Sequence, residues 1–282
     1  MQIRTDLAAE SVAQNGQYEG ISVRHRGTAF RITEIEIDTD EHGAAVGRTK
    51  GRYLTLEQLG LHHSAPEQRQ QVAELADELR GFLPEGAVLV AGLGNADITP
   101  DAVGPETANQ VLATRHLRRE LRENDPDTDF LRELRPVSVI ANGVLGQSGI
   151  ETAELIAALK HTVQPACVVA IDALACSDLH RLGTTVQISD AGISPGSGVE
   201  NRRAELSFRT LGIPVIALGV PTVVDLHTIV RQAGNGDCNA LPNLMVTPRD
   251  IDKLLHHAAR LMAMSLNLAL HPMLRYEDAE AL

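Results

Sequence analysis

The chain has 282 residues, which is enough for one large domain or two small ones. A formal net charge of −12 argues against nucleic acid as a partner, and 2% aromatic residues leave few rings that could stack on bases or sugars. The three cysteines, Cys167, Cys176 and Cys238, have no close ligand spacing, so we expect no disulfide framework and a reducing cytoplasm. The N-terminus lacks an apolar signal core and no apolar run approaches membrane-spanning length, which predicts a soluble protein without a membrane partner.

The first third of the chain has the pattern of a small β-subsheet followed by a helix. In residues 31–38, Ile35 and Ile37 alternate with acidic residues, as in a strand with one wet face. A glycine-punctuated loop follows, and residues 53–56 return as a second strand. Apolar residues at helical spacing then predict a helix over residues 66–82. We therefore place an N-terminal β-subsheet at residues 31–56.

The remainder of the chain alternates between apolar strands and helices. Strands are expected at residues 87–92, 137–141, 166–172 and 213–219, and helices at about 105–121, 150–162, 200–211 and 249–270. Continuous apolar strands that alternate with helices are typical of a parallel sheet covered on both faces. We predict an α/β fold with a mostly parallel sheet, organised as a single domain over residues 1–282 with an α/β core at 84–272.

The bend over residues 92–105 carries glycines and carboxylates at the carboxyl end of the first core strand. In open α/β sheets this edge is where ligands bind. A dinucleotide fingerprint would need a third glycine at position 97, where the chain has Asp97, a residue that would repel a pyrophosphate. We therefore expect these glycines to shape the approach of a carboxylate, and we expect no nucleotide cofactor.

A serine hydrolase is a second possible interpretation. Residues 192–196 match the Gly-x-Ser-x-Gly elbow, and Asp225 and His227 follow in the expected order. The residue after Ser194 is Pro195, which has no N–H to offer to an oxyanion. We expect instead a sharply turning loop whose backbone can still offer donors to a substrate.

The histidines do not predict a metal site. The eleven histidines are scattered, and the adjacent pairs His62-His63 and His256-His257 would face different ways on a helix. No His-Glu-x-x-His motif occurs in the sequence. We therefore expect neither a metal nor any other cofactor.

Two aspartates form the strongest candidate for chemistry. Asp101 precedes Gly104-Pro105, where a helix is expected to begin, so the positive helix end would favour the ionised carboxylate. Asp172 ends an apolar strand, where desolvation would favour the neutral form. A pair of carboxyl groups in opposite protonation states can activate water. Each aspartate could instead only cap a turn, and three others compete for the same role: Asp97, Asp178 and Asp190.

A series of short motifs along the chain is a second indication of its function. In chain order they are Arg4-Thr5-Asp6-Leu7-Ala8, residues 47–53, Gly92-Leu93-Gly94-Asn95, Thr99-Pro100-Asp101, residues 141–144, Ile171-Asp172-Ala173-Leu174, residues 190–193, Pro195-Gly196-Ser197-Gly198-Val199 and Gly219-Val220-Pro221-Thr222. In this order and at these separations the chain resembles the germination protease family. These spore endopeptidases begin the degradation of small acid-soluble spore proteins.

The resemblance implies an atypical aspartic endopeptidase whose catalytic residues are Asp101 and Asp172. It also implies a fold related to hydrogenase maturation peptidases, a homotetramer in the cytoplasm of the spore core, and a zymogen that loses a short N-terminal segment. Cleavage between Asp6 and Leu7 would remove residues 1–6. We assign oxyanion or substrate binding to Asn95 and to the backbone of Gly196, Ser197 and Gly198.

Two alternatives remain at this point. One is a metal-engaging peptidase of the maturation type, which chelation would inactivate. The other is a non-catalytic α/β module that binds the spore proteins, in which the carboxylates only cap turns.

Overall fold

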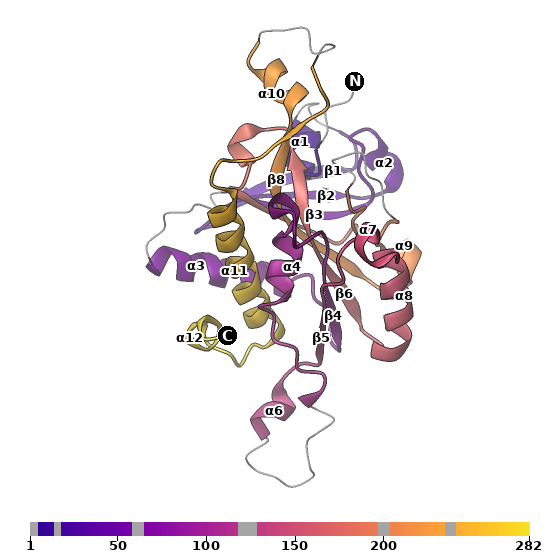
Figure 1. Ribbon diagram of the computed structural model, residues 1–282, viewed down its shortest axis with the longest axis vertical. Helices are drawn as coiled ribbons and strands as arrows, with labels where there is room; N and C mark the ends of the chain where they lie inside the picture. Colours follow the sequence, from indigo (N-terminus) through magenta and orange to yellow (C-terminus); the bar gives the residue numbers. More distant parts are fainter. Residues whose placement is uncertain (1–4, 14–17, 58–64, 118–128, 197–203, 235–240) are drawn as a thin grey trace.

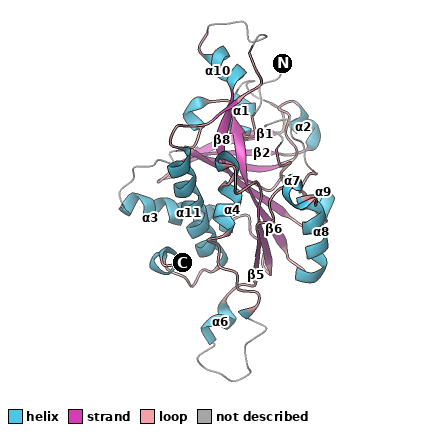
Figure 2. Cartoon of the chain, in the orientation of Figure 1, coloured by secondary structure: helices cyan, strands magenta, loops and turns pink. Residues whose placement is uncertain are grey.

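The computed structural model describes residues 5–13, 18–57, 65–117, 129–196, 204–234 and 241–282 (Figure 1). Strands from all parts of the chain form one nine-stranded sheet in the order β1-β2-β3-β7-β8-β6-β4-β5, with β9 paired to β8. The strands are β1 (Ile21–Arg26), β2 (Arg31–Ile37), β3 (Gly51–Glu57), β4 (Val88–Gly92), β5 (Val137–Ile140), β6 (Cys167–Cys176), β7 (Thr185–Ser189), β8 (Val215–Asp225) and β9 (Met245–Val246). Figure 2 shows helices on both sides of this sheet.

The core of the sheet is parallel, which confirms the predicted fold class. Strands β8, β6, β4 and β5 run in the same direction, and Val90 of β4 lies between Val139 of β5 and Val169 of β6. Every residue of β4 is buried. Burial on both faces is the reason for the continuous apolar runs in the sequence.

Two helical layers cover this core. Helices α3 (Ala65–Arg80), α4 (Val103–Ala108) and α11 (Ile251–Leu270) lie on one face, and α8 (Thr152–Val163) lies on the other (Figure 1). Leu79 of α3 and Leu261 of α11 belong to the same apolar cluster as Val90, whereas Ile156 of α8 packs with the cluster of Leu89. Successive residues of β4 therefore pack in opposite layers.

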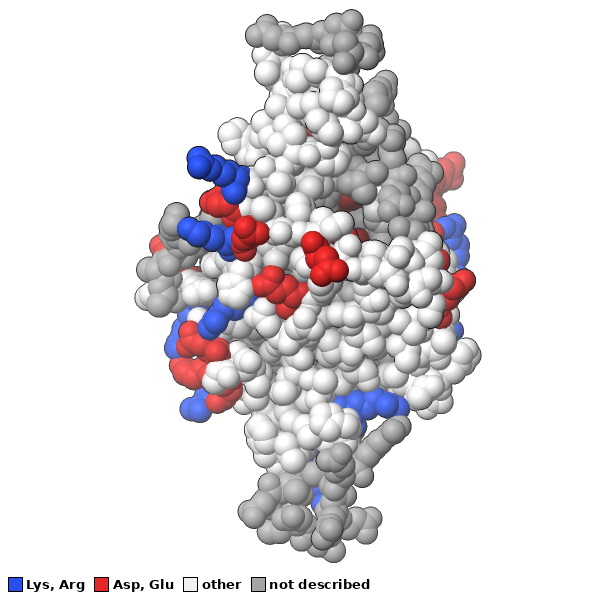
Figure 3. All heavy atoms as spheres, in the orientation of Figure 1, with Lys and Arg blue, Asp and Glu red and all other residues white. Residues whose placement is uncertain are grey.

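Short helices complete the described part of the chain. They are α1 (Ala8–Ala13), α2 (Asp40–Ala44), η1 (Thr99–Asp101), α6 (Asp129–Glu133), α7 (Leu145–Ser148), η3 (Leu179–Arg181), α9 (Phe208–Leu211), α10 (Leu226–Gln232) and α12 (Tyr276–Glu280). On the face drawn in Figure 3, basic side chains along one margin lie next to acidic ones. Ion pairs such as Arg260–Glu280, between α11 and α12, join the two kinds. No helix in the described ranges is long and apolar enough to cross a membrane.

The expected N-terminal β-subsheet is an extension of the main sheet. Strands β1, β2 and β3 pair antiparallel, and β3 then pairs antiparallel with β7, with Tyr53 opposite Ser189. Strand β7 in turn pairs antiparallel with β8, next to the parallel core. The N-terminal residues and the core therefore share one sheet.

Two helices are shorter than predicted because tertiary hydrogen bonds draw the chain out of the helix. The helix expected over residues 105–121 ends as α4 at Ala108, and its last part, residues 118–121, lies outside the described ranges. The Asn267 side chain of α11 accepts from the Leu112 N–H (2.9 Å) and donates to the Gln110 carbonyl (3.0 Å). Of the helix expected over 200–211, residues 200–203 lie outside the described ranges. Leu206 instead exchanges two backbone hydrogen bonds of 2.8 Å with Ile193, so among the described residues 204–211 only Phe208–Leu211 is helical.

Strands β6 and β8 are longer than predicted, and this changes the position of Asp172. The sequence placed Asp172 at the end of a strand, but β6 continues to Cys176 beside β8. Strand β4 ends at Gly92, opposite Ile171. Asp172 is therefore in the middle of its strand and at the first position beyond the end of its neighbour β4.

Candidate active site

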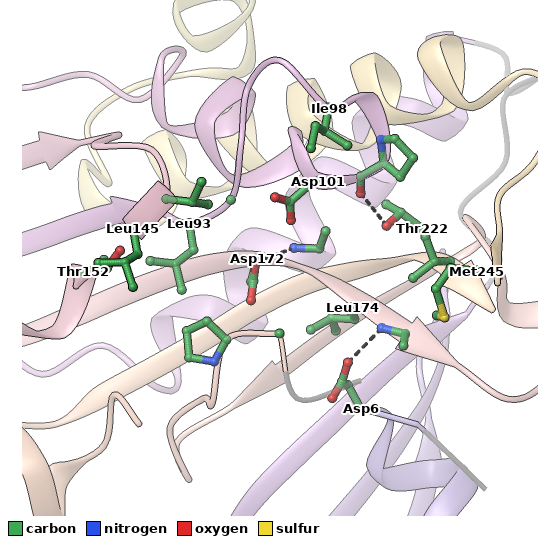
Figure 4. A pocket seen from close by; sticks show the side chains of 18 of the residues that line it. Asp6, Leu93, Ile98, Asp101, Leu145, Thr152, Asp172, Leu174, Thr222 and Met245 are labelled. Atoms are coloured by element: carbon green, nitrogen blue, oxygen red, sulfur yellow. Dashed lines mark hydrogen bonds between the residues drawn. The ribbon is translucent and has the colours of Figure 1, made fainter. Parts of the chain in front are cut away.

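A cleft opens at the carboxyl edge of the parallel strands, past the end of β4 (Figure 4). Residues 172–175 of β6 line it, and so do three aspartates, Asp6, Asp101 and Asp172. Its walls are mostly apolar and include Leu93, Ile98, Leu145, Leu206 and Met245. An adjoining pocket shares Asp6, Asp172, Leu174 and Gly196 with this cleft and extends over Gly219 to Gln187. Asp172 therefore lines both the cleft and the adjoining pocket.

The glycines of the 92–105 bend bring the chain into close contact with itself. A Cβ on Gly92 would lie 2.3 Å from the Gly104 carbonyl oxygen, so only glycine lets α4 pack this near β4. Gly94 has φ of +106°, and a Cβ there would lie 2.1 Å from the main-chain oxygen of Asp101. These glycines therefore hold the segment that carries Asp101 against the end of β4.

Asp101 is the last residue of the short helix η1 and is half-buried. Its Oδ2 accepts a hydrogen bond of 2.7 Å from the Asn95 backbone N–H. The hydroxyl of Thr222, in β8, donates to the Pro100 carbonyl at 2.6 Å and fixes η1 to the sheet. The orientation of Asp101 is therefore set by a backbone donor and by an anchor on a neighbouring strand.

Asp172 is a buried carboxyl group, with 4% of its surface exposed. Burial raises the pKa of Asp172 well above its ordinary value, and the negative charges of Asp101 and Asp6 raise this pKa further. The Ala173 N–H donates to Asp172 Oδ1 at 2.9 Å and lowers the pKa by a smaller amount. The protonated form of Asp172 is thus favoured.

Asp6 is a third carboxylate of the cleft, which the sequence had suggested only as a processing site. Its Oδ2 accepts from the Ala175 N–H and its own N–H donates to the Ala175 carbonyl, both at 2.8 Å. The next residue, Leu7, is fully buried against Leu174 and Cys176. No sequence signal could place Asp6 here, because its partner Ala175 is 169 residues away.

The sequence of this chain is similar to those of known proteins. The sequence model of a family described as germination protease matches residues 2–235. A germination protease of Caldanaerobacter subterraneus subsp. tengcongensis is 37% identical, with 99% of this chain and 98% of the relative covered. Those of Clostridium perfringens and Priestia megaterium are 36% and 35% identical, covering 98% and 95% of this chain and 97% and 94% of the relatives. The chain belongs to the germination protease family.

Membership of this family makes the protein a peptidase and confirms the resemblance seen in its motifs. Among solved structures, a NiFe hydrogenase maturation protease HycI from Thermococcus kodakarensis KOD1 has a TM-score of 0.36. It is 20% identical and covers 67% of this chain and 98% of its own.

The proposed binding residues of this germination protease have different surroundings. The Asn95 side-chain oxygen accepts from the Asp97 N–H (2.9 Å) and from Gln147 Nε2 (2.7 Å), while its backbone N–H holds Asp101. Gly196 lines both the cleft and the adjoining pocket. Ser197 and Gly198 lie outside the described residues. Substrate binding by these four residues stays a prediction.

The three rival aspartates have other contacts. Asp97 is exposed and accepts from Gln147, Asp178 caps η3 through the His180 N–H, and Asp190 accepts from the Arg52 N–H at 2.7 Å. None of the three lines the cleft or the adjoining pocket. Of the three, Asp178 has the capping role that the sequence offered as the alternative, whereas Asp97 and Asp190 bind groups distant in sequence.

The serine hydrolase elements are not gathered around the cleft. Ser194 lines the adjoining pocket, but Asp225 and His227 line neither hollow. His227 Nδ1 lies 3.1 Å from Asp225 Oδ1 at the start of α10, where Asp225 also accepts from the His227 N–H.

Within the described ranges, no group of three or more His, Cys, Asp or Glu side chains could hold a metal ion.

Proposed function

We propose that this germination protease begins the degradation of small acid-soluble spore proteins, and that Asp101 and Asp172 activate the attacking water. The observation that carries the proposal is the buried Asp172, whose pKa is raised in a cleft that it shares with Asp101. A raised pKa lets one carboxyl group keep its proton while its neighbour is charged. That difference is what a general acid and base require at the same pH.

In this mechanism the two carboxyl groups share one proton and hold a water between them. The charged carboxylate removes a proton from the water as its oxygen attacks the carbonyl carbon of the peptide bond. The protonated carboxyl then donates its proton to the departing nitrogen. Because such a pair titrates as a unit, neither aspartate is assigned as the base. The apolar walls, such as Leu93 and Leu145, exclude bulk water and strengthen the interactions of the charges.

The shape of the site supports cleavage within a chain rather than at its end. The cleft and the adjoining pocket meet at Asp172, Leu174 and Gly196. An extended segment could therefore place residues on both sides of Asp172. We assign this activity to one domain of residues 1–282, since β3 and β7 join the N-terminal strands to the core sheet.

Further parts of the proposal follow from family membership. We propose that the protein is processed between Asp6 and Leu7, assembles as a homotetramer and acts in the cytoplasm of the spore core. The location of Asp6 supports the first of these, because Asp6 lines the cleft together with Asp172.

The test compares Asp101→Asn and Asp172→Asn with wild type on a purified small acid-soluble spore protein. Each replacement removes a titrating carboxyl at constant size, and we expect kcat to fall by at least about 100-fold. Asp97→Asn and Asp190→Asn are the matched controls, because both residues lie outside the cleft. Near-normal cleavage by a folded Asp101 or Asp172 variant would refute the mechanism. Loss of activity on chelation, restored by nickel or zinc, would favour the metal-engaging alternative.

A further inference from the structure

One buried side chain of the adjoining pocket makes contacts that the proposed mechanism does not use. Gln187 of β7 is 8% exposed. Its Nε2 donates to the Asp6 carbonyl and its Oε1 accepts from the Ala8 N–H, both at 2.8 Å. The carboxamide thus binds two main-chain groups of an extended segment, two residues apart in sequence.

Gln187 lies on the same face of the sheet as the proposed catalytic group Asp172. Gln187 is paired with Gly219 of β8, and Gly219 is paired with Asp172 of β6. Side chains of directly paired residues point to the same face of a sheet. Gly219 has no side chain of its own, and the Leu174 side chain covers it, because a Cβ on Gly219 would lie 2.8 Å from Leu174 Cγ. The adjoining pocket is lined by Gln187, Leu174 and Asp172 together.

The chemistry of these contacts suits a receptor for a peptide main chain. A carboxamide has one donor group and one acceptor group, as a peptide unit has, so it can pair with a backbone whatever its side chains are. Together with the Ala175 backbone, whose N–H and carbonyl both bind Asp6, it forms what we call the main-chain seat. Residues 6–8 of the chain itself occupy this seat.

The segment in the seat is also anchored away from it. Glu10 of α1, which is 3% exposed, accepts from the Ser177 N–H and hydroxyl (2.6 Å each) and from the Asp178 N–H (3.0 Å). Glu10 lines neither the cleft nor the adjoining pocket. The anchor at Glu10 can therefore be weakened without touching the seat.

We propose that Gln187 is a substrate-binding residue that receives the main chain of the peptide substrate, in the seat that residues 6–8 hold in this structure. The proposal rests on the proposed peptidase site at Asp101 and Asp172. A substrate carbonyl would accept from Gln187 Nε2, and the N–H two residues further along would donate to Gln187 Oε1. The substrate segment must first displace residues 6–8.

Two single variants separate this role from simple anchoring of the N-terminal segment. Glu10→Gln leaves a buried donor of Ser177 or Asp178 without its acceptor and loosens residues 6–8. We expect kcat/KM on a purified small acid-soluble spore protein to rise several-fold. Gln187→Met, of similar size, removes both hydrogen bonds of the carboxamide. In the Glu10→Gln background it should lower kcat/KM about tenfold.

If Gln187 only anchors the segment, Gln187→Met will act in the same direction as Glu10→Gln, and the double variant will be at least as active as the single. That result would overturn the proposal. Thermal unfolding of each variant verifies that the protein is folded.

A binding assay makes the test independent of catalysis. The probe is a synthetic peptide with the sequence of residues 4–11, and every protein carries Asp101→Asn to prevent cleavage. Gln187→Met should weaken binding about tenfold in the Glu10→Gln background. Equal binding would contradict the inference even if the peptidase mechanism holds. Weakened peptide binding by a protein that cleaves no spore protein would instead refute only the proposed function.

Discussion

Gly94→Ala should displace Asp101 without changing any reactive group. Gly94 has φ of +106°, where a side chain strains the backbone by about 1–3 kcal/mol. The new Cβ would also lie 2.1 Å from the Asp101 main-chain oxygen, whereas real Cβ contacts under 3.0 Å essentially never occur. Either the bend at Gly94 or the short helix η1, which carries Asp101, must therefore move by about 1 Å. A misplacement of this size can reduce a rate about 100-fold.

The assay is kcat/KM on a small acid-soluble spore protein, together with urea unfolding. Gly212→Ala is the matched control, because Gly212 has φ of +69° and nothing within 4 Å of the position of a Cβ. Both variants carry backbone strain, but only Gly94→Ala crowds Asp101. We expect both to lose stability and only Gly94→Ala to lose about 100-fold in kcat/KM.

Near-wild-type activity of a folded Gly94→Ala variant would refute this reasoning. It would show either that the bend relaxes without moving Asp101 or that Asp101 does not take part in the reaction. A loss of activity in Gly212→Ala as large as in Gly94→Ala would show that general destabilisation, rather than position, determines the rate.

Two further predictions concern pH. Burial lowers the pKa of His271 from 6.5 to about 4, an effect that the Leu112 backbone offsets only in part, so the unfolded chain binds the proton more readily. The free energy of unfolding should therefore fall by about 3 kcal/mol as the pH drops from above 6.5 to below 4. In urea titrations, His271→Leu should lose this part of the pH dependence. The control His161→Leu, at an exposed histidine, should keep it. Before the proposed processing removes residues 1–6, the charge of Asp6 raises the pKa of Asp172. In the unprocessed chain, Asp6→Asn should therefore move the alkaline limb of the kcat/KM profile to lower pH; a shift to higher pH, or the same shift in Asp190→Asn, would contradict this.

Local patterns were sufficient for the main elements of the core. The apolar run that became β4 and the helical spacing that became α3 lie within a few residues of their predicted ranges. Such patterns depend on period and burial, which the order of residues expresses directly. The helix expected over 105–121 was wrong over residues 109–116, because Asn267 binds Gln110 and Leu112 from a distant helix. No property of residues 109–116 shows that partner.

Some residues of the candidate site were also found from the sequence, and others only from the structure. The bend and the strand edge identified Asp101 and Asp172 from the sequence, and the structure places both in one cleft. The sequence suggested Asp6 only as a processing residue, and it did not suggest Gln187 at all. They meet 181 residues apart along the chain, through a hydrogen bond between a side chain and a carbonyl.

The sequence by itself determined the α/β class, the carboxylate-bearing bend and membership of the germination protease family, because these depend on short motifs and periodic burial. Only the tertiary structure decided what surrounds Asp172. Strand β6 continues past the end of β4, so Asp172 is buried within a strand, where desolvation and two neighbouring carboxylates raise its pKa. The physical reason is that strand pairing and the burial of charge depend on which distant segments pack together, and no local pattern records that.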